Sequence, residues 1–211
     1  MNQPGKTVQW TNAALVALFT LAVLAPPGWT QLSGWRTFGA TRDVKYIDIV
    51  GAEVWALTSG GILAVNPADL SNRILTNTDG LFTNDFEHLL TDASGDLWIA
   101  GLGRLIKRSA GSSSFEAFPF LDQNRAFVRL YALADDQTRL WVGTDIGLAL
   151  FDKITDGGQI QDSYQRFGSI PSQTDVVDVI LTTDSVWVAT PDGLAVGERL
   201  DPLQLKSFAH W

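Results

Sequence analysis

The sequence predicts an all-β protein assembled from one repeated unit. A tryptophan-centred phrase occurs four times, as VWALTSGGI, LWIAGLGRL, LWVGTDIGL and VWVATPDGL, and successive tryptophans are 43, 43 and 46 residues apart. The segments between them are interrupted by Gly, Asp and Ser, and they lack the three- or four-residue apolar spacing of helix-pair solenoids. This period and composition are typical of the four-stranded blade of a β-propeller.

Each unit contains four candidate strands. In the third unit these are VRLYALA (128–134), LWVGT (140–144), LALFD (148–152) and SYQRF (163–167), separated by turns whose Asp and Gly suit hairpins. The fourth unit repeats the pattern with VVDVILT, VWVAT, GLAVG and LKSFA. The blades expected from this pattern are residues 44–76, 86–118, 127–167 and 175–208.

The repeated tryptophan falls on the second strand of each unit. Its large apolar surface is expected to pack against the neighbouring blade, which predicts a structural role rather than a ligand platform. The blade-core residues predicted in this way are Trp55, Trp98, Trp141 and Trp187.

The phrase LWVGTDIGLALFD (140–152) resembles the two-component regulator propeller repeat, and FGSIPSQTDVVDVI resembles the usual link to the next unit. The resemblance covers about residues 34–208, although the second unit has Arg104 where the other units have Gly. It extends to the exported surface propellers associated with type IX secretion. Such a resemblance implies a larger ring than four blades.

A short segment ahead of the first unit supports the larger ring. GWRTF (34–38) resembles the fourth strands SFEAF and SYQRF, and it is expected to be a ring-closing outer strand. The fourth unit already has a candidate fourth strand in LKSFA. We therefore expect a partial propeller over residues 32–211, completed by further blades of the same polypeptide or by another chain.

The first 31 residues have the composition of a secretory signal peptide. Lys6 precedes the uncharged run AALVALFTLAVLA (13–25), which is shorter than the ~20 residues needed to span a bilayer. Cleavage is expected between Gly28 and Leu32. An uncleaved anchor is the alternative. The predicted location is periplasmic, cell-surface or extracellular, with no membrane span in the mature chain.

Composition narrows the classes of function. Fifteen Lys and Arg stand against 23 Asp and Glu, so the acidic surface disfavours nucleic acid as a partner. The absence of cysteine excludes disulfides, thiolate metal sites, a thiol nucleophile and the lipid-bearing residue of a lipoprotein.

Motifs for catalysis, cofactors or metals are absent from the sequence. His88 and His210 are the only histidines, expected in loops or on the surface, and no nucleophile elbow, zinc motif or phosphate-binding loop occurs. We therefore expect no catalytic, cofactor or metal residues. DASGD (92–96) and NTDGLFTND (77–85) place carboxylates near glycines, which predicts turns, with calcium loops as the alternative.

The remaining candidate is the ring face, formed by the links between blades and the turns between second and third strands. Polar residues there suit a protein or carbohydrate contact, while solvated loops are the alternative. The candidate residues are Asp85, Arg104, Arg125, Asp145, Asp175 and Asp192.

Three functions compete on this sequence. The leading one is a non-catalytic exported propeller acting as an interaction scaffold at the cell surface or in the periplasm. The second, implied by the resemblance, is the extracytoplasmic ligand-sensing propeller of a hybrid histidine kinase. The third is a propeller-based lyase, which requires a base that the sequence does not supply convincingly.

Overall fold

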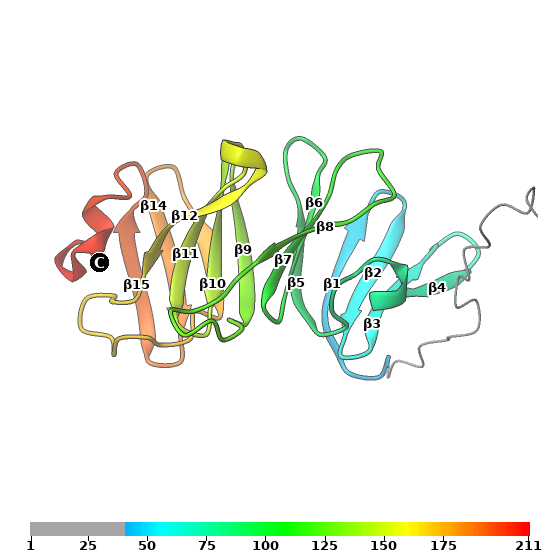
Figure 1. Ribbon diagram of the computed structural model, residues 1–211, viewed down its shortest axis with the longest axis horizontal. Helices are drawn as coiled ribbons and strands as arrows, with labels where there is room; N and C mark the ends of the chain where they lie inside the picture. The colour runs from blue at the N-terminus through cyan, green and yellow to red at the C-terminus, as the bar shows by residue number, and fades with distance from the viewer. Residues whose placement is uncertain (1–40) are drawn as a thin grey trace, which may run out of the picture. The chain divides into compact units, whose positions relative to one another are not determined.

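The computed structural model describes residues 41–211 as β-sheets joined by short links (Figure 1). The fold is that of β-propeller blades, as the sequence predicted. The signal peptide expected at 1–31 and the outer strand expected at 34–38 lie outside the described residues. No helix in the described part of the chain is long and apolar enough to cross a membrane.

Three sheets have four strands and the last has three, and every sheet is antiparallel with its strands in chain order. The first and second sheets contain β1 (Val44–Val50), β2 (Glu53–Thr58), β3 (Gly61–Val65), β4 (Asn72–Leu75), β5 (Phe86–Thr91), β6 (Leu97–Gly101), β7 (Arg104–Arg108) and β8 (Glu116–Pro119). The third and fourth contain β9 (Leu130–Asp136), β10 (Arg139–Thr144), β11 (Gly147–Asp152), β12 (Gln159–Tyr164), β13 (Asp178–Leu181), β14 (Ser185–Thr190) and β15 (Gly193–Glu198). Four 3-10 turns are η1 (Asn77–Asp79), η2 (Thr155–Gly157), η3 (Gln204–Lys206) and η4 (Phe208–His210).

Successive sheets pack through their innermost strands. Strand β1 contacts β5, β5 contacts β9, and β9 contacts β13, so neighbours in the sequence are neighbours in space. Figure 1 shows the second and third sheets meeting where β5 and β9 lie.

Each sheet has two faces, and strand register assigns the residues to them. We call the face that carries the repeated tryptophan the leading face and the opposite one the trailing face. The leading face of the first sheet, with Trp55 and Leu57, packs against the trailing face of the second, with Leu89 and Ile99. The same arrangement joins the second sheet to the third and the third to the fourth.

Three of the four repeated tryptophans are fully enclosed by this packing. Trp55, Trp98 and Trp141 are 0% exposed, whereas Trp187 is 37% exposed. Trp187 was expected in the core with the others. It differs because the leading face of the fourth sheet has no following sheet among the described residues.

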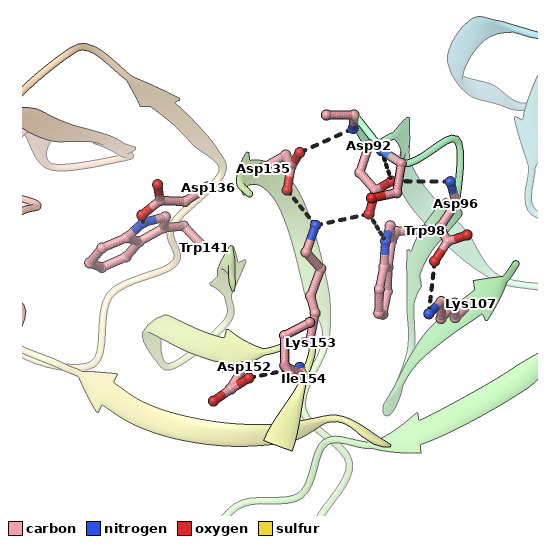
Figure 2. Close-up of polar contacts among 12 residues, drawn as sticks. Asp92, Asp96, Trp98, Lys107, Asp135, Asp136, Trp141, Asp152, Lys153 and Ile154 are labelled. Atoms are coloured by element: carbon pink, nitrogen blue, oxygen red, sulfur yellow. Dashed lines mark hydrogen bonds and ion pairs between the residues drawn. The ribbon is translucent and has the colours of Figure 1, made fainter. Parts of the chain in front are cut away.

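Buried ion pairs tie the second sheet to the third at the end where the first and second strands of each blade meet (Figure 2). Lys153 Nζ lies 2.8 Å from Asp92 Oδ2 and 2.7 Å from Asp135 Oδ1. The Trp98 indole N–H donates to the same Asp92 oxygen, at 2.9 Å. The side chains of Lys153 and Asp92 are only 6% and 2% exposed, so this network joins two blades inside a low-dielectric interface.

The fourth strand expected within LKSFA does not form. Residues 204–206 and 208–210 are 3-10 turns that fold back onto the preceding strands. The Trp211 indole donates to the Leu205 carbonyl at 2.8 Å, and both side chains crowd Gly197 of β15, where an added Cβ would lie 2.5 Å from Leu205. Leu205 is buried in the core between the third and fourth sheets, so these residues fill that core instead of extending the sheet.

Candidate functional site

A β-bulge occurs near the start of the innermost strand in each of the first three sheets. The register shifts around Lys45 in β1, Glu87 in β5 and Tyr131 in β9. These positions lie at the end of the sheets where the links between blades arrive and where the second strand turns into the third. Bulges re-aim side chains, and here they bring polar groups from three blades together at the ring face.

Two of these bulge residues, Lys45 and Glu87, form an ion-pair network with Asp85 and Arg129. Lys45 Nζ lies 2.6 Å from Asp85 and 2.7 Å from Glu87, and Arg129 Nη1 lies 2.8 Å and 2.6 Å from the same two carboxylates. We call Lys45, Asp85, Glu87, Arg129 and Tyr131 the mouth cluster. Its ionic side chains are partly exposed, so the network is accessible to a partner.

Electrostatics keep the network charged near neutral pH. Burial alone would raise the pKa of Asp85, but hydrogen bonds from Lys45 and Arg129 outweigh it and hold that pKa below its usual value. Burial alone would also lower the pKa of Lys45, yet its bonds to Asp85 and Glu87 raise it. Asp85 and Lys45 are thus stabilised in their ionised forms, which favours fixed electrostatic recognition over proton transfer.

Two further candidate residues act on the mouth cluster. Burial first, and then the charges of Asp175 and Asp145, raise the pKa of Tyr131, so its phenol stays protonated and able to donate. Asp145 Oδ1 is buried and has no hydrogen-bond partner among the described residues. Asp85, Asp145 and Asp175 therefore belong to one region of the ring face.

The other three candidate residues, Arg104, Arg125 and Asp192, form no hydrogen bond or ion pair with the described residues of the mouth cluster. The Arg104 guanidinium stacks over Phe82, 5.5 Å from the ring centroid. Asp192 accepts a hydrogen bond from Thr174 Oγ1 at 3.1 Å. Arg125 has a positive φ of 62° in the turn that precedes β9. A binding role for these six residues stays a prediction.

Four residues of the mouth cluster were not predicted from the sequence: Lys45, Glu87, Arg129 and Tyr131. Lys45, Glu87 and Tyr131 lie near the starts of β1, β5 and β9, where strict alternation would have assigned each to a blade face, and Arg129 directly precedes β9. The signal available was the recurrence of Lys45, Glu87 and Tyr131 at one position of three successive units, and Arg129 had no such signal.

A cavity of about 350 Å³ with a mixed polar and apolar lining lies beside the third sheet. The link that precedes β9 forms one wall with Gln123 and Asn124, and β11, β12 and the next link form the other with Gln165 and Gln173. Amide side chains above apolar residues such as Leu121 and Ile160 suit a ligand with several hydrogen-bonding groups.

Groups suited to catalysis or metal binding are poorly placed in the described residues. His88, expected in a loop or on the surface, lies in strand β5 with its ring centroid 4.3 Å from that of Tyr46, and burial lowers its pKa. No group of three or more Asp, Glu, His or Cys within residues 41–211 could hold a metal ion. In the two possible calcium loops, Asp92 accepts from the Ser94 and Asp96 amides, and Asp79 closes a capping box with Thr76.

Comparison with known proteins supports the fold. No family model and no curated protein matches the sequence. Among solved structures, the extracellular domain of the hybrid two-component system protein BT4673 from B. thetaiotaomicron matches 74% of this chain and 20% of its own, at 19% identity and a TM-score of 0.59. The corresponding domain of BT3049 matches 74% of this chain and 21% of its own, at 18% identity and a TM-score of 0.60.

PorZ of Porphyromonas gingivalis, a surface component of the type IX secretion system, matches 76% of this chain and 28% of its own, at 17% identity and a TM-score of 0.54. The chain thus spans about a fifth to a quarter of the length of these neighbours. At the level of fold, they confirm the resemblance to two-component regulator propellers and type IX surface propellers.

Proposed function

We propose that this chain is a non-catalytic, exported β-propeller that acts as an interaction scaffold, with the mouth cluster as the centre of its contact with a protein or carbohydrate. The observation that carries the proposal is the ion-pair network in which Lys45, Glu87 and Arg129 join three blades beside the bulges of the innermost strands. Bulges are structural features that re-aim side chains rather than defects of a sheet. Here they recur at one position in three sheets, beside a charged surface at the ring face.

The chemistry of this surface suits binding. Carboxylates, a guanidinium and a protonated phenol offer both donors and acceptors to a peptide backbone or to sugar hydroxyls. The acids and bases are paired with one another, so none is poised to take a proton from a substrate. A lyase would need a general base, and His88 is the histidine closest in sequence to the mouth cluster. His88 lies in strand β5 with its ring against Tyr46, which argues against its acting as that base.

Export is part of the proposal. The apolar run at 13–25 supports it. The similar solved structures support it as well, because they are extracellular domains and a bacterial surface component. The mature protein is expected outside the cytoplasm, with an amino terminus between Gly28 and Leu32 that mass spectrometry of fractionated cells can identify.

Site-specific photo-crosslinking in the cells that make the protein tests the binding face. A photoreactive residue at Tyr131 is expected to capture a partner, while the same residue at Ile154, which is 69% exposed at the opposite end of the third sheet, captures none. Isothermal titration calorimetry with a polysaccharide digest tests for a carbohydrate partner. The heat of binding should be lost in Arg129→Ala. Adducts from position 154 alone, or neither adduct nor heat, would contradict the assignment of the ring face.

A ligand-sensing propeller of a hybrid histidine kinase is the second candidate function. The observation that favours it is the fold likeness to extracellular domains of hybrid two-component system proteins. Reading the gene beyond Trp211 separates the two, because a sensor requires a membrane helix followed by a kinase in the same polypeptide.

A further inference from the structure

Two sheet faces at the ends of the blade series are apolar, and no other sheet within residues 41–211 packs on them. We call Ile47, Ile49 and Ile74, on the trailing face of the first sheet, the first flank. The last flank lies on the leading face of the fourth sheet and consists of Ile180, Trp187, Leu194 and Val196. Ile47 is 63% exposed and Leu194 is 65% exposed. Contiguous apolar surface of this kind marks an interaction site in a folded protein.

Strand register shows what each flank would contact. Leu194 pairs with the residue two places after its tryptophan, and Ile47 pairs with the residue one place after. The counterparts of Leu194 in the first three sheets are Ile62, Leu105 and Leu148, and those of Ile47 in the last three are Leu89, Leu133 and Val179. All six are buried, and they share cores as the pairs Ile62 with Leu89, Leu105 with Leu133, and Leu148 with Val179. The last flank therefore has the surface that receives a first flank.

Charge at the interfaces selects the occupant. At each interface between two sheets of this chain, the indole of the earlier sheet's tryptophan donates a hydrogen bond to a carboxylate. A Lys or Arg of the later sheet lies beside that tryptophan and carboxylate. Arg108 lies 4.7 Å from the Trp55 ring, Lys153 pairs with Asp92 beside Trp98, and Arg199 pairs with Asp136 beside Trp141.

Among the described residues, the first flank lacks the cation of this arrangement, and the last flank lacks the carboxylate. The first flank has Val65 at the position of Arg108, because Val65 pairs with Val54 as Arg108 pairs with Leu97. Lys153 and Arg199 stand two residues further along, where the first sheet has Pro67, so neither cation position is charged there. The Trp187 indole donates to no carboxylate within residues 41–211, whereas the other three do. A covering sheet with the usual cation would bury that charge without a partner, at a cost that the neutral first flank avoids.

We propose that a second copy of this chain covers both flanks, with the last flank of each copy on the first flank of the other. One two-fold axis relates the copies, so the two contacts are identical and the assembly closes on itself. This inference is independent of the proposed binding function, since the flanks are sheet faces and the mouth cluster lies at the strand ends.

Size-exclusion chromatography with light scattering on the purified mature protein tests the pairing. The expected mass is twice that of one chain. Leu194→Glu and Ile47→Lys should each halve it, because either variant places a charge in both of the identical contacts. Ile154→Glu, an equally exposed apolar residue away from the flanks, should leave the doubled mass unchanged. A wild-type monomer, or an assembly that survives Leu194→Glu, would overturn the proposal.

Mixing the two monomeric variants tests which flanks meet. In a mixed pair, Glu at position 194 of one copy faces Lys at position 47 of the other, and the second contact is wild type. The equimolar mixture should therefore regain the doubled mass. Circular dichroism matching the wild type shows that both variants are folded. Two folded monomers that stay monomeric when mixed would contradict the pairing of last flank with first flank.

Discussion

Replacing Trp141 by alanine is expected to lower the free energy of unfolding by about 3 to 5 kcal/mol. The side chain is 0% exposed and lies in the core between the third and fourth sheets, stacked on Tyr164 with 5.8 Å between ring centroids. Its removal leaves a cavity that strands on both sides hold open, so the lost burial and the unfilled volume both contribute.

Urea unfolding monitored by circular dichroism measures this change. Trp141→Phe is the matched control, because it keeps an aromatic ring in the core and should lose a much smaller part of the stability. The indole hydrogen bond to Asp136 is long, at 3.4 Å, so its loss adds little. Unchanged stability together with lost partner binding would identify Trp141 as a surface platform and would falsify the core assignment.

Lys153→Ala is expected to cost about 3 to 5 kcal/mol, since it leaves a buried carboxylate without its cation. The Asp92 side chain is 2% exposed and receives both Lys153 and the Trp98 indole (Figure 2). Lys206→Ala is the control. Lys206 also pairs with an aspartate, at 2.6 Å, but it is 53% exposed, so its removal should cost less than about 1 kcal/mol.

The dependence on pH distinguishes a lost ion pair from lost packing. Burial alone would raise the pKa of Asp92, but bonds from Lys153 and Trp98 outweigh it and hold that pKa below its usual value. A depressed carboxyl pKa contributes stability above the unfolded-state pKa, and this is lost as pH falls through the folded-state pKa. The gap between wild type and Lys153→Ala should therefore narrow in acid. A gap that is constant with pH would indicate that Lys153 acts through packing alone.

Regular features of the fold could be predicted from the sequence because each had a repeated local cause. The tryptophan period predicted the blades, and Gly or Asp turns predicted the hairpins, so the second and third strands of the third unit lie where they were expected. Its fourth strand was expected at 163–167 and lies earlier, at Gln159–Tyr164. LKSFA does not form the strand expected from its place in the fourth unit. Packing of Leu205 and Trp211 against Gly197 decides its conformation, and that contact is tertiary.

The candidate site was harder to predict because it depends on irregularities. Asp85 was found because links between blades reach the ring face in any propeller. Lys45, Glu87 and Tyr131 were missed because a bulge shifts register without a composition of its own. The exposure of Trp187 depends on which sheet follows it, which local sequence around VWVAT does not encode.

Hydrogen exchange followed by mass spectrometry on the folded protein tests most directly whether these units are blades of one propeller. Core strands exchange only through global opening, while turns exchange quickly. We predict slow exchange in β2, β6 and β10, which carry the enclosed tryptophans and recur with the same period, and fast exchange in the turns between them. Protection confined to one unit, or protection that does not recur at the positions of Trp55, Trp98 and Trp141, would contradict the blade architecture on which the binding face and the paired flanks depend.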